Sequence, residues 1–600
     1  MILNSVLLFS YLFFCAISVI GYGYLTIKFL KIDNNFFNIG EIGLLGFFSI
    51  FGISLFVHFF IPLYQYLNLT VLLIGILFFL NFFNQIKKNF LINNYLYYLI
   101  PIILLPSIIV IRTHADYEWY HLPYINYLNN FKIIFGLANF SNNLSFGHGW
   151  QDIIAIFSIP LIETKGLTAL GMIFYFFYLL TLIKYIEKEN NQNKIIIFII
   201  LFYSLSIFNN LIDFGAEAQP VMLMILFGLN SIFITTNKNK EFMLKILFYF
   251  IFALFLRIGS VVFLPTFLIL FILYFKLFLN LISNNLRPIM FTILILFLVL
   301  LRNFIHSGCL IFPLPSTCFN NDNIKWAVPL DNVNERYYVQ SSKAKGYEFY
   351  IKSNGPDEHL NLYYNKILNN QIQHPQKYST DILLWPKYWF LDHDKDRIIN
   401  IIIIVCVCFI ILIFSKKEKI VYIKNKEQSL LLISFFLSTL FWFYTSPQTR
   451  YGGIAIIAVT CLYLLCYLFF NFKIDNKKLK IISNIIIFIP LIYVSVKNYN
   501  RISNLSIDDF QKFPYPNYKE YKLNKEYVNY SINNFNINLK KHTKGEVLGE
   551  PIRCGNIDMI CIPEPLKVCI DNIEIIYDYI IVINSGKKCL DQYKNNYWQH

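Results

Sequence analysis

The amino-acid sequence predicts an all-α polytopic transmembrane bundle, and three observations lead to that fold class. Of its 600 residues, 56% are hydrophobic and only 14% are charged, a balance outside the range of soluble globular proteins. Apolar runs of about 20 residues, each long enough to cross a hydrocarbon layer of roughly 30 Å, recur along most of the chain. The connections between these runs alternate between lysine-rich and lysine-poor, as they do in helical membrane proteins.

We expect about 14 membrane spans. Their approximate cores are 5–28, 41–62, 67–84, 95–111, 166–186, 194–210, 219–236, 242–257, 259–280, 288–305, 397–415, 428–446, 451–470 and 479–497. The first run lacks a basic segment before it and is longer than the core of a signal peptide, so we expect it to be retained as a membrane helix.

The net charge is +15, and the basic residues are unevenly distributed among the loops. Basic residues gather in every second connection: Lys28 and Lys31, Lys87 and Lys88, Lys184 and Lys188, Lys238 and Lys240, Lys276 and Arg287, then 416–426 and 473–480. Because basic loops are retained in the cytoplasm, both the N-terminus and the C-terminal segment are predicted to be external. This distribution favours anionic membrane lipids over nucleic acid as the partner of the basic residues.

Two parts are predicted along the chain: a transmembrane domain, 1–497, and an external C-terminal appendage, 498–600. The first part contains two long external segments, 112–165 and 306–396. In the segment 112–165 we expect two amphipathic helices at the membrane surface, near 119–128 and 150–160, with Asp152 capping or flanking the second. Alternating polar and β-favouring residues in KVCIDNIEIIYDYIIVIN predict a small α/β or β-rich fold for the appendage.

Six of the 11 cysteines fall in segments predicted to be external: Cys309, Cys318, Cys554, Cys561, Cys569 and Cys589. An oxidising compartment would allow them to pair. Proximity along the chain suggests Cys309 with Cys318 and Cys554 with Cys561, although spacing alone leaves the connectivity open.

The ionisable residues that stand out in this apolar chain all emerge on the predicted external side. They are Asp116, Glu118 and His121 at the start of the first long loop, Asp213 and Glu217 between the sixth and seventh spans, Arg257 after the eighth, Arg302 and His306 at the end of the tenth, and Arg450 after the twelfth. Ionisable groups at membrane depth are costly unless they pair or line a water-filled cavity, so these residues predict a shared polar chamber. The alternative is that each reaches lipid headgroups separately from a helix end.

Four stretches carry a family resemblance: DYEWYHLPYINYL with the following FGLANFSNNLSFGHGWQDIIAIF, LRNFIHSGCLIFPLPSTCF, SPQTRYGG, and EPIRCGNIDMICIPEP. In this order they resemble an uncharacterised family of bacterial polytopic membrane proteins, over most of the chain. More distantly, the chain is similar to the GT-C superfamily of membrane glycosyltransferases, in which the first long external loop begins with an acidic residue or pair. Asp116 with Glu118 occupies that place here, although three additional spans precede it.

The resemblance implies a glycosyltransferase of the bacterial inner membrane. It would move a sugar from a polyprenyl-phosphate donor to a glycan, lipid or protein acceptor of the cell envelope on the external face. Asp116 would serve as the general base, with Glu118 and His121 assisting at the acceptor or the phosphate. The resemblance leaves the need for a metal open: Asp116 and Glu118 could share a divalent metal, Mg²⁺ or Mn²⁺.

The same resemblance implies that arginine side chains bind the phosphate of the donor. Arg450 and Arg302 are the first candidates, followed by Arg257 and His306, because a planar guanidinium matches phosphate oxygens bidentately. Inversion at a sugar that already carries a phosphate leaving group needs one base and no acid, unlike the two-carboxylate arrangement of glycosidases.

Two other function classes remain open. An O-antigen polymerase-like or ligase-like enzyme also has many spans and one large external loop, but depends on arginine rather than an acidic pair. A flippase or transporter of lipid-linked glycans would have charges at mid-span and broken helices in matched halves, with Asp213 and Glu217 as its candidate residues. The sequence contains no glycine-rich nucleotide motif, zinc-ligand spacing or nucleophilic-serine elbow.

Overall fold

A computed structural model gives the fold of the chain. The residues that it describes are 2–89, 96–109, 120–140, 142–147, 149–160, 162, 166–189, 191–206, 217–319, 324–354, 373–392, 416–417, 426–445, 447–448, 453–469, 472–473, 476–504, 527–532, 535–540, 560–562, 573–576 and 579–583.

Helices make up most of the described chain. In the N-terminal half they are α1 (Ile2–Phe29), α2 (Ile39–His58), α3 (Gln65–Asn81), α4 (Phe83–Asn89), α5 (Leu96–Ile109), α6 (Leu122–Asn130), α7 (Leu137–Phe140), η2 (Asn142–Ser145), α8 (Gly149–Ala155), η3 (Leu167–Ala169), α9 (Leu170–Lys188), α10 (Asn191–Ser206), α11 (Ala218–Thr236), α12 (Lys240–Leu256), η5 (Ile258–Phe263), α13 (Leu264–Leu273) and α14 (Phe275–Asn284). After these come α15 (Arg287–Ser307), η6 (Pro315–Thr317), α16 (Leu330–Ala344), α17 (Tyr347–Asn354), α19 (Pro375–Thr380), α20 (Trp385–Asp392), α22 (Lys426–Thr445), α23 (Ile454–Phe469) and α24 (Asn476–Ser503).

Six described helices are long and apolar enough to cross a membrane, and a seventh span results if η5 with α13 and α14 counts as one crossing. The six are Val6–Phe29, Ile39–His58, Leu170–Lys188, Ala218–Thr236, Arg287–Ser307 and Lys426–Thr445. The seventh is bent by 79° between Leu273 and Phe275, inside the predicted span 259–280. The chain is therefore a helical membrane protein, whereas the number of about 14 spans stays a prediction. The predicted span 397–415 lies outside the described residues.

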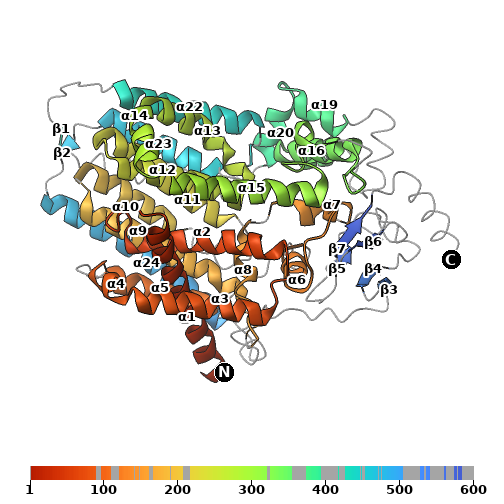
Figure 1. Ribbon diagram of the computed structural model, residues 1–600. Helices are drawn as coiled ribbons and strands as arrows, with labels where there is room; N and C mark the ends of the chain where they lie inside the picture. The colour runs from red at the N-terminus through yellow and green to blue at the C-terminus, as the bar shows by residue number, and fades with distance from the viewer. Residues whose placement is uncertain are drawn as a thin grey trace.

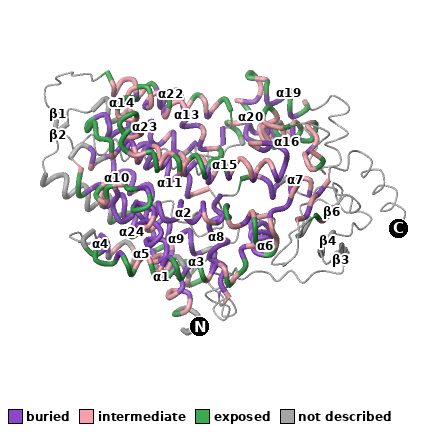
Figure 2. Tube along the Cα trace, viewed as in Figure 1, coloured by how far each residue is buried: buried purple, intermediate pink, exposed green. Residues whose placement is uncertain are grey.

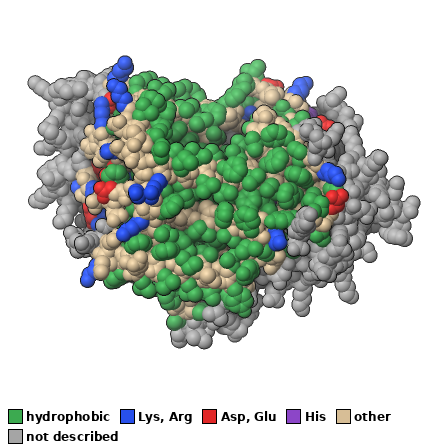
Figure 3. Space-filling view, in the orientation of Figure 1, with side chains coloured by type: hydrophobic (Ala, Val, Ile, Leu, Met, Phe, Trp, Pro, Cys, Tyr) green, Lys and Arg blue, Asp and Glu red, His purple; other side chains and the backbone are tan. Residues whose placement is uncertain are grey.

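The bundle has two distinct ends (Figure 1). One end carries α6, α7, α16, α19, α20 and the C-terminal strands, and we call it the site end. The opposite end carries α4, α14 and the short strands β1 (Lys416–Lys417) and β2 (Phe472–Lys473). Hydrophobic side chains cover the middle of the face seen in Figure 3 and charged side chains lie toward both ends, as expected for a protein surrounded by lipid.

A buried ionic network joins four helices near the opposite end. Glu41 at the start of α2 is fully buried, and its Oε1 lies 3.0 Å from Nζ of Lys245 in α12. The hydroxyls of Tyr185 in α9 and Tyr249 in α12 also donate to this carboxylate, and Asn230 of α11 donates to Tyr185 at 3.0 Å. Each charge in this network is paired and hydrogen-bonded. The network can therefore hold the helices together without leaving an unpaired ion in the apolar interior.

Strands occur in the C-terminal part, as the alternating sequence predicts. β3 (Tyr527–Ile532) pairs antiparallel with β4 (Phe535–Lys540), which pairs parallel with β5 (Ile560–Ile562). β6 (Ile573–Ile576) and β7 (Tyr579–Val582) form an antiparallel hairpin in which Ile573 faces Val582. The division of the chain at 497 is not marked by a helix end, since α24 continues to Ser503.

The two helices expected in the segment 112–165 are present as α6 and α8, and both are buried within the protein. Residues 122–129 of α6 and 149–155 of α8 are all buried (Figure 2). The two helices pack on each other, α8 also packs on α2, and the chain at Phe135 is hydrogen-bonded to Ile580 and Val582 of β7. Tertiary contacts therefore cover the apolar faces that would otherwise favour the lipid interface.

Candidate functional site

Helix α8 is fixed at the site end by three earlier helices. The Ser54 hydroxyl of α2 donates to the Asp152 carbonyl at 2.6 Å. The Asn68 side-chain amide of α3 donates to the carbonyls of Ala155 and Ser158 at 3.0 and 2.9 Å. The Tyr11 hydroxyl of α1 donates to the carbonyl of Phe157 at 2.7 Å. These bonds satisfy backbone carbonyls that the short helix leaves unpaired, and so α8 keeps its position without being exposed.

Asp152 and Arg302 form the centre of the site end. Arg302 Nη1 pairs with Asp152 Oδ2, and both side chains are at most 3% exposed. The Tyr124 hydroxyl of α6 donates to Asp152 Oδ1 at 2.9 Å. Burial raises the pKa of Tyr124 well above its ordinary value, so its hydroxyl stays protonated and serves as a donor.

Two histidines flank this ion pair. Nε2 of His306, one turn after Arg302 in α15, lies 3.2 Å from the Tyr127 hydroxyl of α6. On the other side of Tyr127, the ring of His58 packs edge to face at 5.2 Å, and His58 Nε2 lies 3.1 Å from the carbonyl of Phe131. The Tyr127 hydroxyl also accepts from the backbone N–H of Ile134, and burial raises the pKa of this phenol. Tyr127 therefore links α2, α6 and α15.

His121 belongs to the same cluster. It lies directly before α6, is 7% exposed, and its Nδ1 is 2.6 Å from Nε2 of Gln151, the neighbour of Asp152 in α8. The two side chains share a hydrogen bond, and which of them donates depends on the tautomer of the His121 ring. We refer to the whole set as the polar cluster: His58, His121, Tyr124, Tyr127, Gln151, Asp152, Arg302 and His306.

The structure brings together three of the residues predicted from the sequence: His121, Arg302 and His306. Arg257 pairs with Glu217, whose Oε1 lies 3.4 Å from Nη1 of the arginine. The end of α12 that precedes Arg257 nevertheless contacts α8, because Gly149 of α8 packs on the backbone of Phe255 and Leu256. Four other candidates lie outside the described residues: Asp116, Glu118, Asp213 and Arg450. Among the described residues no three metal-binding side chains gather, and the predicted metal pair, Asp116 with Glu118, is not among them.

One hydrogen-bond donor of the polar cluster has no acceptor among the described residues. Arg302 Nη2 is buried and has no hydrogen-bond partner in the described part of the chain, although Nη1 of the same group is paired. The hydroxyl of Ser145, which is 2% exposed, likewise lacks a partner among the described residues. Buried donors without partners are rare in native proteins, and each needs an explanation such as a bound water, an ion or a catalytic role.

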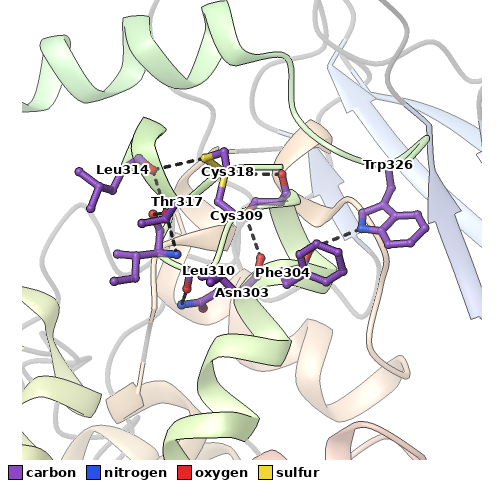
Figure 4. The surroundings of a disulfide bond; sticks show 10 residues. Asn303, Phe304, Cys309, Leu310, Leu314, Thr317, Cys318 and Trp326 are labelled. Carbon is purple, nitrogen blue, oxygen red and sulfur yellow. Dashed lines mark hydrogen bonds between the residues drawn. A yellow bond between two sulfur atoms is a disulfide. The ribbon is translucent and has the colours of Figure 1, made fainter. Parts of the chain in front are cut away.

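A disulfide closes the loop that follows α15. Gly308 ends the helix with φ 77°, a left-handed conformation that favours glycine, and Cys309 then bonds to Cys318 (Figure 4). Asn303 Nδ2 donates to the Leu310 carbonyl at 3.1 Å, so the loop is tied back to the helical turn that carries Arg302. The pairing of Cys309 with Cys318, expected from their proximity in sequence, is confirmed. Cys554 lies outside the described residues.

We expect the double variant Cys309→Ser with Cys318→Ser to unfold more easily by about 2–3 kcal/mol, because the crosslink restricts a short loop in the unfolded chain. Chemical unfolding of the purified protein with and without reductant measures this effect. Reductant should bring the wild-type protein to the level of the variant and leave the variant unchanged. Equal stability of both proteins under oxidising conditions would contradict the prediction.

The segment 306–396 contains a buried lysine that joins several of its parts. Lys345, which ends α16, is 6% exposed, and its Nζ donates to the Ser379 carbonyl at 2.7 Å. The Trp385 ring lies 5.2 Å away and the Tyr444 ring of α22 lies 5.7 Å away. Burial lowers the pKa of Lys345 to about 8. The segment is therefore anchored to the end of α22 by an ammonium group in an aromatic surrounding.

The pKa of Lys345 predicts a dependence of stability on pH. Between about pH 8 and 10.5 the unfolded chain binds a proton that the folded chain releases, so the free energy of unfolding rises with pH across this window. Relative to Lys345→Met, the wild-type protein should gain on the order of 2 kcal/mol between about pH 7.5 and 9.5. Thermal unfolding of both proteins at the two pH values measures this gain. A difference that does not change with pH would contradict it.

Several residues of the polar cluster were missed by reasoning from sequence. Asp152 was expected only to cap or flank a surface helix, and Tyr124, Tyr127, Gln151 and His58 were not singled out. One signal was present for Asp152: it is a carboxylate within the apolar run DIIAIF, where a charge requires a partner.

The fold and the polar cluster define a class: a polytopic helical membrane protein with a buried ion pair at one end of its bundle. Residues 5–458 match a domain of unknown function, DUF8201, and since this match covers most of the chain, the protein belongs to that family. No curated protein and no solved structure matches the chain.

Proposed function

We propose that this chain is an inverting, GT-C-like glycosyltransferase of the bacterial inner membrane. It moves a sugar from a polyprenyl-phosphate donor to a glycan, lipid or protein acceptor of the cell envelope on the external face. The observation that carries the proposal is the buried Arg302, whose Nη1 is paired with Asp152 while its Nη2 has no partner in the described part of the protein. A guanidinium can serve two acceptors at once, and Asp152 leaves one side of it for a phosphate oxygen.

The acidic pair of the sequence is tethered to this cluster. Asp116 precedes His121 by five residues, so the chain keeps their Cα atoms within about 18 Å. His121 in turn contacts Gln151, next to Asp152. We infer that a base tethered at this distance from His121 serves a sugar whose phosphate binds Arg302.

The proposed reaction uses few protein groups. The Asp116 carboxylate takes the proton of the acceptor hydroxyl, whose oxygen attacks the anomeric carbon of the sugar. The bond between that carbon and the phosphate oxygen breaks, and the phosphate leaves with the electron pair. Arg302, whose Nη1 is paired with Asp152, donates from Nη2 to an oxygen of the leaving phosphate, and burial makes this hydrogen bond stronger than it would be in water. Glu118 orients the acceptor, or shares a divalent metal with Asp116.

Transport of a lipid-linked glycan is the second candidate, and the buried pair of Glu41 with Lys245 favours it, since charges within a membrane often mark a transport path. Mass spectrometry of extracted lipids from a deletion strain separates the two functions. A transferase predicts that the unmodified acceptor and the sugar donor accumulate together. Accumulation of the finished glycan on its lipid carrier would instead indicate transport and would contradict the proposal.

A further inference from the structure

A short segment of the first external loop covers Arg302. The turn η2 ends at Ser145, and Gly147 follows it with its backbone exposed. A Cβ atom placed on Gly147 would lie 3.5 Å from Arg302 Nη2. Apart from the chain neighbours of Gly147, no other atom of the described residues lies within 4 Å of that position. Within the described part of the chain, a residue without a side chain therefore lies next to the unpartnered nitrogen.

A second donor lies in the same segment. The Ser145 hydroxyl, two residues before Gly147, is buried and also lacks a partner within the described ranges. Arg302 Nη2 and Ser145 Oγ thus bring a guanidinium N–H and a hydroxyl to one short stretch of chain. Both are groups that bind phosphate oxygens.

The position of this segment is set by the second external segment. Arg336 of α16 donates from Nη2 to Asn143 Oδ1 at 2.5 Å, and its guanidinium lies 5.2 Å from the centre of the Phe146 ring. Phe146 also packs on Phe312, in the disulfide loop, at 5.8 Å. These contacts hold the residues just before Gly147 against α16 and the disulfide loop.

We propose that Gly147 determines the specificity of the site for an anion: a phosphate oxygen of the lipid-linked donor reaches Arg302 Nη2 past Gly147, and the Ser145 hydroxyl donates to the same phosphate. This inference rests on the proposed function and names the route and the atoms by which the donor binds. Any side chain at 147 covers Nη2. A methyl group at 3.5 Å makes an ordinary van der Waals contact, so alanine at this position closes the route without forcing the structure apart.

The test compares Gly147→Ala and Gly147→Val with the wild-type chain, each full-length in lipid nanodiscs. Native mass spectrometry measures the binding of a polyprenyl monophosphate and of the polyprenol with the same chain. We expect the wild-type protein to prefer the phosphate. Gly147→Ala should reduce this preference about tenfold or more, since a charge-assisted hydrogen bond is lost, and Gly147→Val should reduce it further. Binding of the polyprenol and the unfolding temperature should not change.

Controls separate the possible failures. Ser283→Val, at an exposed position of α14 near the opposite end, should bind both lipids as the wild type does. Retention of the phosphate preference in Gly147→Val would overturn the role of Gly147 and leave the proposed function standing. A wild-type protein without any preference would overturn both. Inorganic phosphate forms a third arm: binding of free phosphate without binding of the lipid phosphate would assign the site to another anion and also overturn the inference.

Discussion

Replacement of Asp116 by asparagine should abolish sugar transfer while the protein is still inserted and folded. Asparagine has nearly the same shape but cannot take a proton from the acceptor, and loss of a general base costs roughly 10²–10⁴ in rate. Donor binding should remain, because the phosphate is assigned to Arg302. The measurement is transfer to acceptor in membranes from a deletion strain that expresses each variant at equal level.

Asp331→Asn is a matched control for this variant. Asp331 is an exposed carboxylate of α16 at the site end, so this substitution also replaces a charged aspartate by neutral asparagine. We expect wild-type transfer from Asp331→Asn. Full transfer from Asp116→Asn would remove the catalytic assignment of Asp116, whatever the control shows.

The second large effect concerns the ion pair of Asp152 with Arg302. Asp152→Asn should lower the free energy of unfolding by about 3–5 kcal/mol, because it leaves a buried guanidinium without its counter-charge. The double variant Asp152→Leu with Arg302→Met replaces both charges by apolar groups of similar size. It should recover most of this stability, since an apolar pair avoids the cost of burying two ions.

Function should not recover with stability. We expect the double variant to bind no polyprenyl monophosphate above the level of the polyprenol, because Nη2 has been removed. The pair at the opposite end offers the control: Glu41→Gln with Lys245→Met also removes a buried ion pair, and glutamine keeps an acceptor for Tyr185 and Tyr249. This control should retain donor binding. A double variant at 152 and 302 that is stable and binds the donor normally would show that the pair is only structural.

The sequence predicted the helical segments better than their surroundings. Apolar runs such as 41–62 and 288–305 correspond to α2 and α15, because a membrane helix must satisfy its own backbone and is therefore encoded locally. The predicted span 259–280 instead bends by 79° near Tyr274. Hydropathy alone does not distinguish a straight span from one that turns at the interface.

The polar cluster could be predicted only in part, for a physical reason. His121, Arg302 and His306 stand out as polar residues at the ends of apolar runs. Asp152, the partner of Arg302, does not stand out in the same way. It is 150 residues away, and the pair forms only when α8 packs against α2 and α3. The same holds for β7: alternation predicted a strand near 579–582, but its hydrogen bonds to Phe135 depend on tertiary contacts.

The sidedness of the bundle is the central claim, because a donor and acceptor outside the cell require the polar cluster to open to that side. Labelling of single cysteines with a membrane-impermeant maleimide in intact spheroplasts tests it directly. Glu335→Cys is exposed on α16 at the site end, and Ser283→Cys is exposed on α14 near the opposite end. We predict labelling of position 335 in intact spheroplasts and of position 283 only after lysis. Labelling of 283 but not 335 before lysis would place the polar cluster in the cytoplasm and contradict an external transferase.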